Sequence, residues 1–513
     1  MRYILTAEQM KASDTATINE IGIPSLVLME RAALRCVEVM KEEQIDLTKP
    51  LVVCGSGNNG GDGFAVARLL YEEGYLPEIA FVGNRNSRSE ETRTQMEILE
   101  NLGMSYGNSL PDAEYSVIID AVFGIGLSRE VKGHYRDVIE RMNRYKGAKV
   151  AIDIASGISA DTGQVLGCAF RADLTVTFAY GKLGQYLFPG STFSGKTVVR
   201  PIGIKNMALE NSTEVSYMFE SSDLKNRMPK RYADSNKGTY GRVLLIAGSK
   251  GMSGAAYLAA KAAYLTGAGL VRIYTEESNR QILQQLLPEA VLTTYIEPDK
   301  AGEMQAGKAV EEQTAELLGW ADVVCIGCGL GVSECSKALL KTVLKNNAKP
   351  CVIDADGLNI LAGFSAEEKI QYRLNEKCYI LTPHMKEMSR LTGETVENLK
   401  KERKKLLREF VKKVHVVCAL KDSRTLVAAP DKALYLNTTG NSAMSKGGAG
   451  DVLAGVITGL LAQGLAVYEA ASLGVYLHGL AGDAARDKKG GYSVLAGDIA
   501  EALAEILLTL EDE

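Results

Sequence analysis

The feature that most constrains the fold is a repeated pattern, in which a short apolar run leads into glycine or polar residues and then into a helix-forming stretch. The apolar runs are continuous rather than alternating, which is typical of strands in a parallel sheet that helices cover on both faces. They form two series, the first at 51–55, 76–83, 115–120, 149–154, 174–179 and 197–202, and the second at 241–249, 270–275, 322–327, 351–356, 378–382 and 414–420. The sequence therefore predicts an α/β protein with two domains, the first a Rossmann-like doubly wound sheet.

The length of the chain also requires more than one hydrophobic core, because it has 513 residues. Residues 205–238 lack a long apolar run and contain the polar stretch MPKRYADSNKG. We therefore place the boundary near residue 215, with one domain at 1–215 and the other at 220–513. Small residues from Gly254 to Gly269 are expected to let one helix of the second domain pack very close to its sheet.

Composition narrows the classes of protein to consider. Hydrophobic residues make up 46% of the chain and charged residues 24%, which is ordinary for a soluble globular protein and argues against disorder. The net charge is -5 and no apolar run approaches the length of a membrane span. We expect a cytoplasmic homo-oligomer that binds neither nucleic acid nor membrane. The basic segment 399–413 is interpreted as a solvated helix with an apolar face formed by Leu399, Leu406, Leu407, Phe410 and Val411.

The nine cysteines do not indicate a disulfide framework, because their number is odd and their spacing is irregular. Cys325 and Cys328 have the CxxC spacing but lie where a strand runs into a glycine turn, without a second CxxC or a histidine cluster. We interpret them as buried structural cysteines in preference to a metal or redox site.

A glycine loop follows the first strand of the first series, and Gly55, Gly57 and Gly60 fit the pattern GxGxxG. The usual dinucleotide site also needs an acidic residue at the end of the second strand, to hold a ribose. Asn84 and Arg85 stand there instead. An NAD-dependent dehydrogenase is therefore disfavoured.

Oxygen-bearing side chains follow three strands of the first series: Asn58, Asn59 and Asp62 after one, Asp120 after another, and Asp153 and Ser156 after a third. Each alone would be a routine turn or cap residue, but the carboxyl ends of strands in a doubly wound sheet meet in one crevice. Oxygen ligands with little formal charge suit a hard cation of low charge, and they could equally hold a ribose. Asp153 could act as a general base if burial raised its affinity for a proton.

The segments GNNGGDG, VFGIGLSRE and DIASGI appear in the order and form of the NAD(P)HX epimerase family, the YjeF N-terminal domains, and the resemblance covers about residues 1–215. It implies a potassium site at Asn59, Asp120 and Ser156, and a catalytic role for Asp153. It also implies that a hydrated nicotinamide nucleotide binds near Asn58, Asn59, Gly60, Gly61, Asp62, Gly124, Ile125, Gly126, Leu127, Ser128, Arg129, Glu130, Tyr135 and Asp153. One departure is Ala155, where DxPSG would have proline.

A second glycine loop, NSAMSKGGAGDVLAG at 441–455, leads into an apolar helix-forming sequence. Free backbone N–H groups and the positive end of the helix dipole then face one point, which suits an oligophosphate. Asp451 would repel that ligand unless it has a chemical task, such as taking a proton from a hydroxyl group. The alternative is a glycine-rich turn with Asp451 as the helix N-cap. The chain has no GxxxxGK[ST], so this is not a P-loop.

Other strand ends of the second series are also polar or rich in glycine, namely 327–331, Asp354 with Asp356, 382–384 with Glu387, and 421–425. His384 is a candidate because it stands at a strand end with Glu387 one turn away, whereas His415 and His478 are interpreted as structural. Lys421 and the glycine loop offer a cationic and a backbone contact for phosphate from two separate elements.

The segments KGTYGRVLLIAGSKGMSGAAYLAAKAAYLTGAGLV, DADGLN, LTPHMKEMSRLTG and GGAGDVLAGVI resemble the ribokinase-like ADP/ATP-dependent NAD(P)H-hydrate dehydratases, over about residues 220–508. The resemblance implies hydrated substrate near Ala255, Gly329, His384 and Asp451. It implies nucleotide contacts at Lys421, Asp422, Ser423, Arg424, Thr425, Asn441, Lys446, Gly447, Gly448 and Gly450. The chain departs from the family at Asp422, where glycine is common, at Cys328, where proline is common, and at Ser445 and Lys446, where Thr-Gly is frequent.

Together the two resemblances imply a repair enzyme for hydrated nicotinamide cofactors. The first domain would interconvert the R and S epimers of hydrated NADH or NADPH. The second would dehydrate the S form at the expense of ADP, giving AMP and phosphate, with Asp451 as the base and Mg²⁺ and backbone N–H groups stabilising the phosphoryl charge. The residues do not separate ADP from ATP. The alternative is a ribokinase-like small-molecule kinase fused to a nucleotide-binding regulatory domain.

Overall fold

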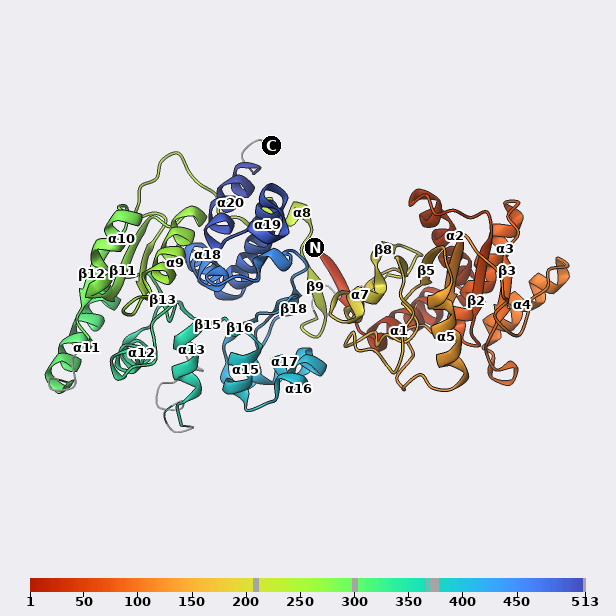
Figure 1. Cartoon of the computed structure of the whole chain (residues 1–513), viewed down its shortest axis with the longest axis horizontal. Helices are drawn as coiled ribbons and strands as arrows, with labels where there is room; N and C mark the ends of the chain where they lie inside the picture. Colours follow the sequence, from red (N-terminus) through yellow and green to blue (C-terminus); the bar gives the residue numbers. More distant parts are fainter. Residues whose placement is uncertain (206–211, 298–302, 366–367, 369–377, 511–513) are drawn as a thin grey trace. The chain divides into compact units, whose positions relative to one another are not determined.

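The computed structural model describes residues 1–205, 212–297, 303–365, 368 and 378–510. It consists of two compact units, Arg2–Ser216 and Tyr217–Glu513, and the second unit also includes Met1. In Figure 1 the first unit runs from red to yellow and the second from yellow-green to blue. Among the described residues, no helix is long and apolar enough to cross a membrane.

The first unit is built on a six-stranded sheet in which every neighbouring pair is parallel. Its order is β3 (Glu78–Phe81), β2 (Pro50–Cys54), β4 (Val117–Ala121), β5 (Ala148–Ile152), β6 (Leu174–Phe178) and β8 (Lys196–Arg200). The strands β1 (Arg2–Leu5) and β7 (Gly181–Lys182) form a parallel pair outside this six-stranded sheet. The predicted parallel α/β architecture is confirmed, because residues of β2, β4, β5 and β6 are buried on both faces of the sheet.

Helices of this unit follow the predicted alternation: α3 (Asn58–Glu72), α4 (Glu90–Asn101) and α5 (His134–Arg144), with short α6 (Leu183–Tyr186) and α7 (Gly190–Ser194) near the end. At the start of the chain α1 (Ala7–Ala16) runs into a π-helical turn, Thr17–Ile21, before α2 (Ser25–Glu42). The interruption falls at Gly22, whose φ of 84° is left-handed, and at Pro24, which lies just before α2. This break turns α1 so that it contributes to the cavity described below.

The second unit contains a longer sheet, in the order β12 (Val291–Tyr295), β11 (Leu270–Glu276), β10 (Arg242–Ile246), β13 (Val323–Ile326), β14 (Cys351–Ile353), β15 (Tyr379–Leu381), β16 (Val417–Leu420), β17 (Leu426–Ala428) and β18 (Leu434–Leu436), with β9 (Ser216–Met218) beside β18. Pairs from β12 to β16 are parallel, whereas β16–β17 and β17–β18 are antiparallel. The parallel part brings the carboxyl ends of β13, β14, β15 and β16 to one edge.

The helices of the second unit are α8 (Ser221–Arg227), α9 (Ser253–Thr266), α10 (Arg280–Leu286), α11 (Glu303–Trp320), α12 (Glu334–Asn346), α13 (Ala355–Ala362), α15 (Met385–Thr392), α16 (Val396–Lys401), α17 (Arg403–Val414), α18 (Ala449–Ala462), α19 (Val467–Ser493) and α20 (Ala496–Leu508). The small residues of α9 make its closest packing with another helix, α18, beside it in Figure 1. A Cβ added to Gly455 would lie 2.2 Å from the carbonyl oxygen of Ala259, and one added to Gly459 would lie 2.7 Å from that of Ala263. This close contact fixes the position of α18 and of the glycine loop before it.

The basic segment is helical as expected, but it is divided into α16 and α17 at Glu402. Of its apolar residues, Leu399, Leu407, Phe410 and Val411 are buried, and Leu406 is half-buried. All nine cysteines are free thiols, and Cys325 and Cys328 are fully buried.

Candidate active sites

The first unit has a cavity of about 980 Å³ at the carboxyl ends of its strands. Ten of the residues expected to bind the hydrated nucleotide line it: Asn58, Asn59, Asp62, Gly124, Ile125, Gly126, Leu127, Ser128, Arg129 and Asp153. Gly60, Gly61, Glu130 and Tyr135 do not. Gly60 packs against the backbone of Gly55, Glu130 forms an ion pair with Lys132, and Tyr135 lines a separate cavity of about 410 Å³.

Asp153 has an unusual backbone conformation, with φ at 63°, and its side chain is held from several sides. The Nζ atom of Lys182 lies 2.5 Å from Asp153 Oδ1 and also donates to the Thr177 hydroxyl group at 2.8 Å. Thr177 donates to the same carboxylate oxygen at 3.1 Å, and Gln185 donates to the Asp153 carbonyl oxygen at 2.7 Å. The Asp153 carboxylate is therefore fixed at the cavity wall by a lysine that is only 1% exposed.

Lys182 was not predicted as a site residue. It stands in FAYGKLGQY, directly after a buried strand, and a lone lysine in such apolar sequence was the available signal. Its partner Asp153 lies 29 positions earlier, so the pairing itself depends on the tertiary fold.

Two more carboxyl groups face the same cavity, Asp14 from α1 and Asp62 from the N-terminal part of α3. Burial raises the pKa of Asp14 to about 6, and the negative charge of Asp153 adds to this effect. Burial also raises the pKa of Asp62 well above its usual range, with Asp153 and Asp14 contributing. Asp14 was missed in the sequence, although it lies one helical turn after Met10, which also lines the cavity.

The three residues expected to hold potassium lie together beside this cavity. Asp120 is fully buried, and it accepts hydrogen bonds from the Ser156 hydroxyl group at 2.7 Å and the Ser156 backbone N–H at 2.8 Å. Burial raises the pKa of Asp120 to about 6, although these hydrogen bonds oppose the shift. Asn59 donates to the carbonyl oxygen of Phe123 at 3.1 Å, and Ser156 accepts from the Phe123 N–H at 2.8 Å.

Asn59 supplies the test of whether these residues fit a cation. Its side chain is 8% exposed, and its Oδ1 atom has no hydrogen-bond partner within the described part of the chain. A buried carbonyl-type oxygen without a donor is costly, and a cation would satisfy it. The donors here are all oxygen atoms and carry one formal negative charge, which suits K⁺.

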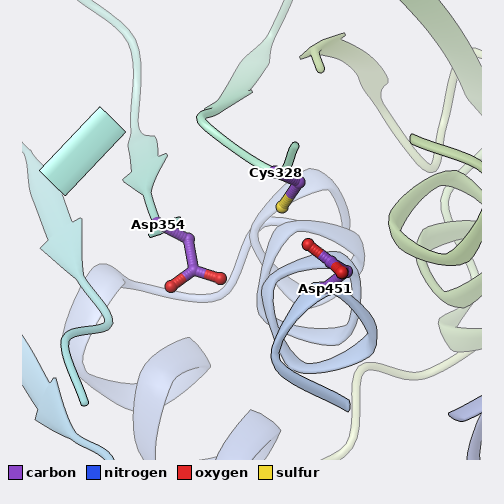
Figure 2. A group of neighbouring side chains, drawn as sticks. All are labelled: Cys328, Asp354 and Asp451. Carbon is purple, nitrogen blue, oxygen red and sulfur yellow. The ribbon is translucent and has the colours of Figure 1, made fainter. Parts of the chain in front are cut away.

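The second unit gathers its polar groups at the start of α18. Asp451 is the third residue of this helix, and the N-cap position belongs to Gly448, so Asp451 is not the N-cap. The carboxylates of Asp451 and Asp354 and the thiol of Cys328 come within 4.8 Å of one another, and Figure 2 shows the three side chains converging from α18 and from the ends of β14 and β13. Burial raises the pKa of Asp451 to about 6, and the charge of Asp354 adds to this effect.

Lys421 connects this group to the glycine loop. Its Nζ atom donates to Asp354 Oδ1 at 2.6 Å, and the Thr382 hydroxyl group donates to the same oxygen at 2.7 Å. A Cβ added to Gly450 would lie 3.4 Å from Lys421 Nζ. The lysine and the glycine loop, expected to hold phosphate from two separate elements, therefore lie against each other.

His384 pairs with Lys421 in an isolated parallel bridge, which places it at the same edge of the sheet. Its Nδ1 atom accepts hydrogen bonds from the backbone N–H groups of Lys386 at 3.0 Å and Glu387 at 3.2 Å, so it caps α15. Burial and the positive charge of Lys421 lower the pKa of His384. His384 is therefore a neutral imidazole with its Nδ1 atom occupied.

Ala255 and Gly329, both expected near the substrate, are in contact. A Cβ on Gly329 would lie 2.7 Å from the Ala255 Cβ, and the φ of Gly329 is 59°. Gly448 also has a left-handed φ, of 93°, and a Cβ there would lie 2.6 Å from Leu258. Both positions require glycine.

Several residues expected at the nucleotide have partners within the protein. Asp422 forms an ion pair with Arg403, and Asn441 donates a hydrogen bond to the Asp483 carboxylate. Three others donate hydrogen bonds to carbonyl oxygens: Arg424 to that of Thr438, Thr425 to that of Asp422, and Lys446 to that of Tyr492. Ser423 is exposed, and a Cβ added to Gly447 would meet no atom within 4 Å. Lys421 and Gly450 lie against each other next to Asp451, and Gly448 is the N-cap residue of α18.

Comparison with known proteins covers both units. The family model described as NAD(P)H-hydrate dehydratase matches residues 243–505, and that of the YjeF-related protein N-terminus matches residues 25–184. The chain is 36% identical to the bifunctional NAD(P)H-hydrate repair enzyme of Moorella thermoacetica, over 100% of this chain and 98% of that protein. The chain belongs to the family of bifunctional NAD(P)H-hydrate repair enzymes.

Other members of the family align over similar lengths. The repair enzyme of Thermofilum pendens is 34% identical over 99% of this chain and 97% of its own, and that of Escherichia coli is 32% identical over 98% and 93%. Among solved structures, the ADP/ATP-dependent NAD(P)H-hydrate dehydratase of Bacillus subtilis, co-crystallised with ATP and Mg²⁺, covers 57% of this chain and 97% of that one, with 32% identity and a TM-score of 0.49. The family resemblance found in the sequence is confirmed.

Proposed function

We propose that this chain repairs hydrated NADH and NADPH at two sites, an epimerase in the first unit and an ADP-dependent dehydratase in the second. The observation that supports this most directly is the alignment with bifunctional repair enzymes along the whole chain. A ribokinase-like small-molecule kinase fused to a nucleotide-binding regulatory domain is not favoured, because the alignment with bifunctional repair enzymes covers both units.

At the first site, the hydrated nicotinamide ring would occupy the cavity with its hydroxyl group near Asp153. Lys182 and Thr177 hold that carboxylate in one position, so it is ready to exchange a proton with the substrate. Asn59, Asp120 and Ser156 would hold K⁺. When bound, K⁺ supplies fixed positive charge beside the cavity, and the unpartnered Asn59 oxygen supports this assignment.

At the second site, the N–H groups of the glycine loop and the Lys421 ammonium would bind the phosphates of ADP. Asp451, ionised above a pKa of about 6, takes the proton of the substrate hydroxyl group. The oxygen then attacks the terminal phosphoryl group and AMP leaves. Loss of a proton from the neighbouring carbon and departure of phosphate restore the double bond of the dihydropyridine ring.

Mg²⁺ fits this second site as a partner of the nucleotide. Asp354 and Asp451 provide one or two carboxylates, and Mg²⁺ usually combines such ligands with substrate phosphates and water. When bound, it neutralises the charge that collects on the transferring phosphoryl group. Cys328 is too soft a ligand for Mg²⁺ and would remain outside its coordination.

The test supplies each epimer alone, with ADP, Mg²⁺ and K⁺, and follows the absorbance of the reduced nicotinamide with the release of AMP and phosphate. The S epimer needs only the second site, whereas the R epimer needs both. Asp451→Asn should stop recovery from either epimer, and Asp153→Asn should slow recovery from R alone. If the wild-type protein restores no reduced nicotinamide from the S epimer, the proposed dehydratase is wrong.

A further inference from the structure

The cavity of the first unit contains a carboxyl group that neither the base Asp153 nor the potassium site uses. Asp14 lines this cavity from α1, on the same face of the helix as Met10, which also lines it. In the described part of the structure its carboxyl group has no hydrogen-bond or ion-pair partner. The proposed base Asp153 and the proposed potassium ligand Asn59 line the same cavity, so Asp14 faces the space in which the hydrate would bind.

The reaction itself requires two proton-handling groups. The two epimers carry the hydroxyl group on opposite faces of the same ring carbon, so a bond to that carbon must break on one face and form on the other. If the carbon–oxygen bond breaks, an acid must protonate the departing hydroxyl group, and a base on the other face must accept the proton of the incoming water. A single rigidly held carboxylate cannot serve both faces.

We propose that Asp14 is the second catalytic acid–base group of the epimerase and acts on the face of the ring opposite to Asp153. This inference rests on the proposed epimerase function. In one direction the Asp14 carboxyl group gives its proton to the hydroxyl oxygen, the carbon–oxygen bond breaks with its electron pair on oxygen, and water leaves. The ring nitrogen stabilises the resulting cation. A solvent water then adds to the other face and gives a proton to Asp153, and the reverse direction restores both groups.

The charged groups around the two carboxylates fit a role for Asp14 as the acid and for Asp153 as the base. Asp153 forms an ion pair with Lys182, whereas Asp14 forms no ion pair in the described part of the chain. Burial raises the pKa of Asp14 to about 6, although the charge of Lys182 opposes the shift. Asp14 can therefore carry a proton near neutral pH while Asp153 accepts one. The other charged or titratable groups lining this cavity are Glu8, Lys11, Asp62, Glu91 and Arg129. Of these, burial raises the pKa of Asp62 well above its usual range.

The decisive variant is Asp14→Asn in the full-length protein. We expect epimer exchange to fall at least about 100-fold, as is usual when a general acid is removed. The KM for the hydrate in epimer exchange should stay within about threefold. Dehydration of the S epimer by the same protein molecule should be unchanged, which shows that the second unit is intact, while the retained KM shows that the cavity of the first unit is folded. Glu20→Gln is the matched control, because it removes one negative charge from an exposed residue of the adjoining π-helical turn that does not line the cavity, and it should leave exchange within about twofold.

Two further readouts separate catalysis from a structural effect. In water enriched in oxygen-18, each conversion should place one solvent oxygen on the product. The exchange rate of the wild type should also fall as the pH rises above about 6, because the protonated fraction of Asp14 decreases. The residual exchange rate of Asp14→Asn should not show this fall with rising pH.

The outcomes distinguish the two proposals. If the wild type exchanges no epimers, the proposed epimerase itself fails. If the wild type is active and Asp153→Asn is inactive but Asp14→Asn keeps its rate, the role of Asp14 is overturned and the epimerase stands. Loss of hydrate affinity without loss of the rate at saturation would make Asp14 a binding residue only. Retention of the original oxygen would show that the bond to nitrogen breaks, and would refute the proton transfer described above.

Discussion

Asp451→Asn should make the second unit more stable while it removes the dehydratase activity. The carboxyl group has a pKa of about 6 in the folded protein and 3.8 as an ordinary aspartate. A difference of about 2 pKa units corresponds to about 3 kcal/mol by which folding disfavours the ionised form. Water that reaches this half-buried side chain reduces the effect, so we expect a gain of about 1 to 3 kcal/mol at pH 7.5.

The sign of the pH dependence follows from the raised pKa. Below about pH 4 the side chain is protonated in both the folded and the unfolded state, and Asn has no advantage. Between about pH 4 and 6 the unfolded state loses its proton first, so the stability of the wild type falls relative to that of the variant. Above about pH 6 the difference is complete and constant.

The single tryptophan makes this measurable in the full-length protein. Trp320 ends α11 of the second unit, with the Arg272 guanidinium group 4.4 Å from its ring, so its fluorescence reports unfolding of that unit. Guanidinium titrations near pH 4 and at pH 7.5 give the two stability differences. Asp431→Asn, an exposed substitution in the same unit, should change stability by no more than about 0.5 kcal/mol at either pH. A variant that is no more stable at pH 7.5, or whose gain is equal at both pH values, would refute the reasoning.

Three other predictions concern the two sites. The kcat/KM of the dehydratase should rise about tenfold per pH unit up to a midpoint near pH 6. Lys421→Met should move that midpoint upward, because the lysine lowers the pKa of Asp451. An unchanged midpoint would contradict this role of Lys421. Gly448→Ala should weaken ADP binding, measured by calorimetry, about tenfold, because alanine would have to adopt a left-handed φ. Gly447→Ala should have little effect on ADP binding. Equal losses in the two variants would argue against a contact between Gly448 and ADP. Asp120→Asn should make epimer exchange insensitive to K⁺ concentration, and a preserved K⁺ response would place the ion elsewhere.

The strands were predictable because most are continuous apolar runs with glycine or polar residues after them. The short strands β12, β17 and β18 were not predicted. The first has mostly half-buried residues and lies at an edge of the sheet, and the other two are only three residues long and belong to antiparallel pairs. The tight packing of α9 was expected against the sheet, but its closest contact is with the glycines of α18, a pairing between segments almost 200 residues apart that no local pattern encodes.

The sites were predictable wherever a functional side chain follows a strand. The expectation that polar residues at strand ends meet at one edge of the sheet predicted that Asp120 and Ser156 lie together, and the structure has them hydrogen-bonded. The same expectation grouped Lys421 with Asp354, and these two side chains form a hydrogen bond. It did not identify Lys182, because this residue belongs to a two-residue strand of a pair outside the six-stranded sheet. It also could not identify Asp14, because α1 precedes the whole sheet and reaches the cavity only through its tertiary packing.

The two units use the same electrostatic arrangement, although their sheets and chemistry differ. In each, an aspartate after a strand forms an ion pair with a lysine, Asp153 with the buried Lys182 and Asp354 with the half-buried Lys421. In each, a second aspartate on a helix forms no ion pair among the described residues. Burial together with the charge of the paired carboxylate raises its pKa to about 6, although the lysine opposes the shift. In the second unit this unpaired aspartate, Asp451, is the proposed base. The equivalent position in the first unit is held by Asp14, which is why a catalytic role for it follows from the physical arrangement and not from its place in the sequence.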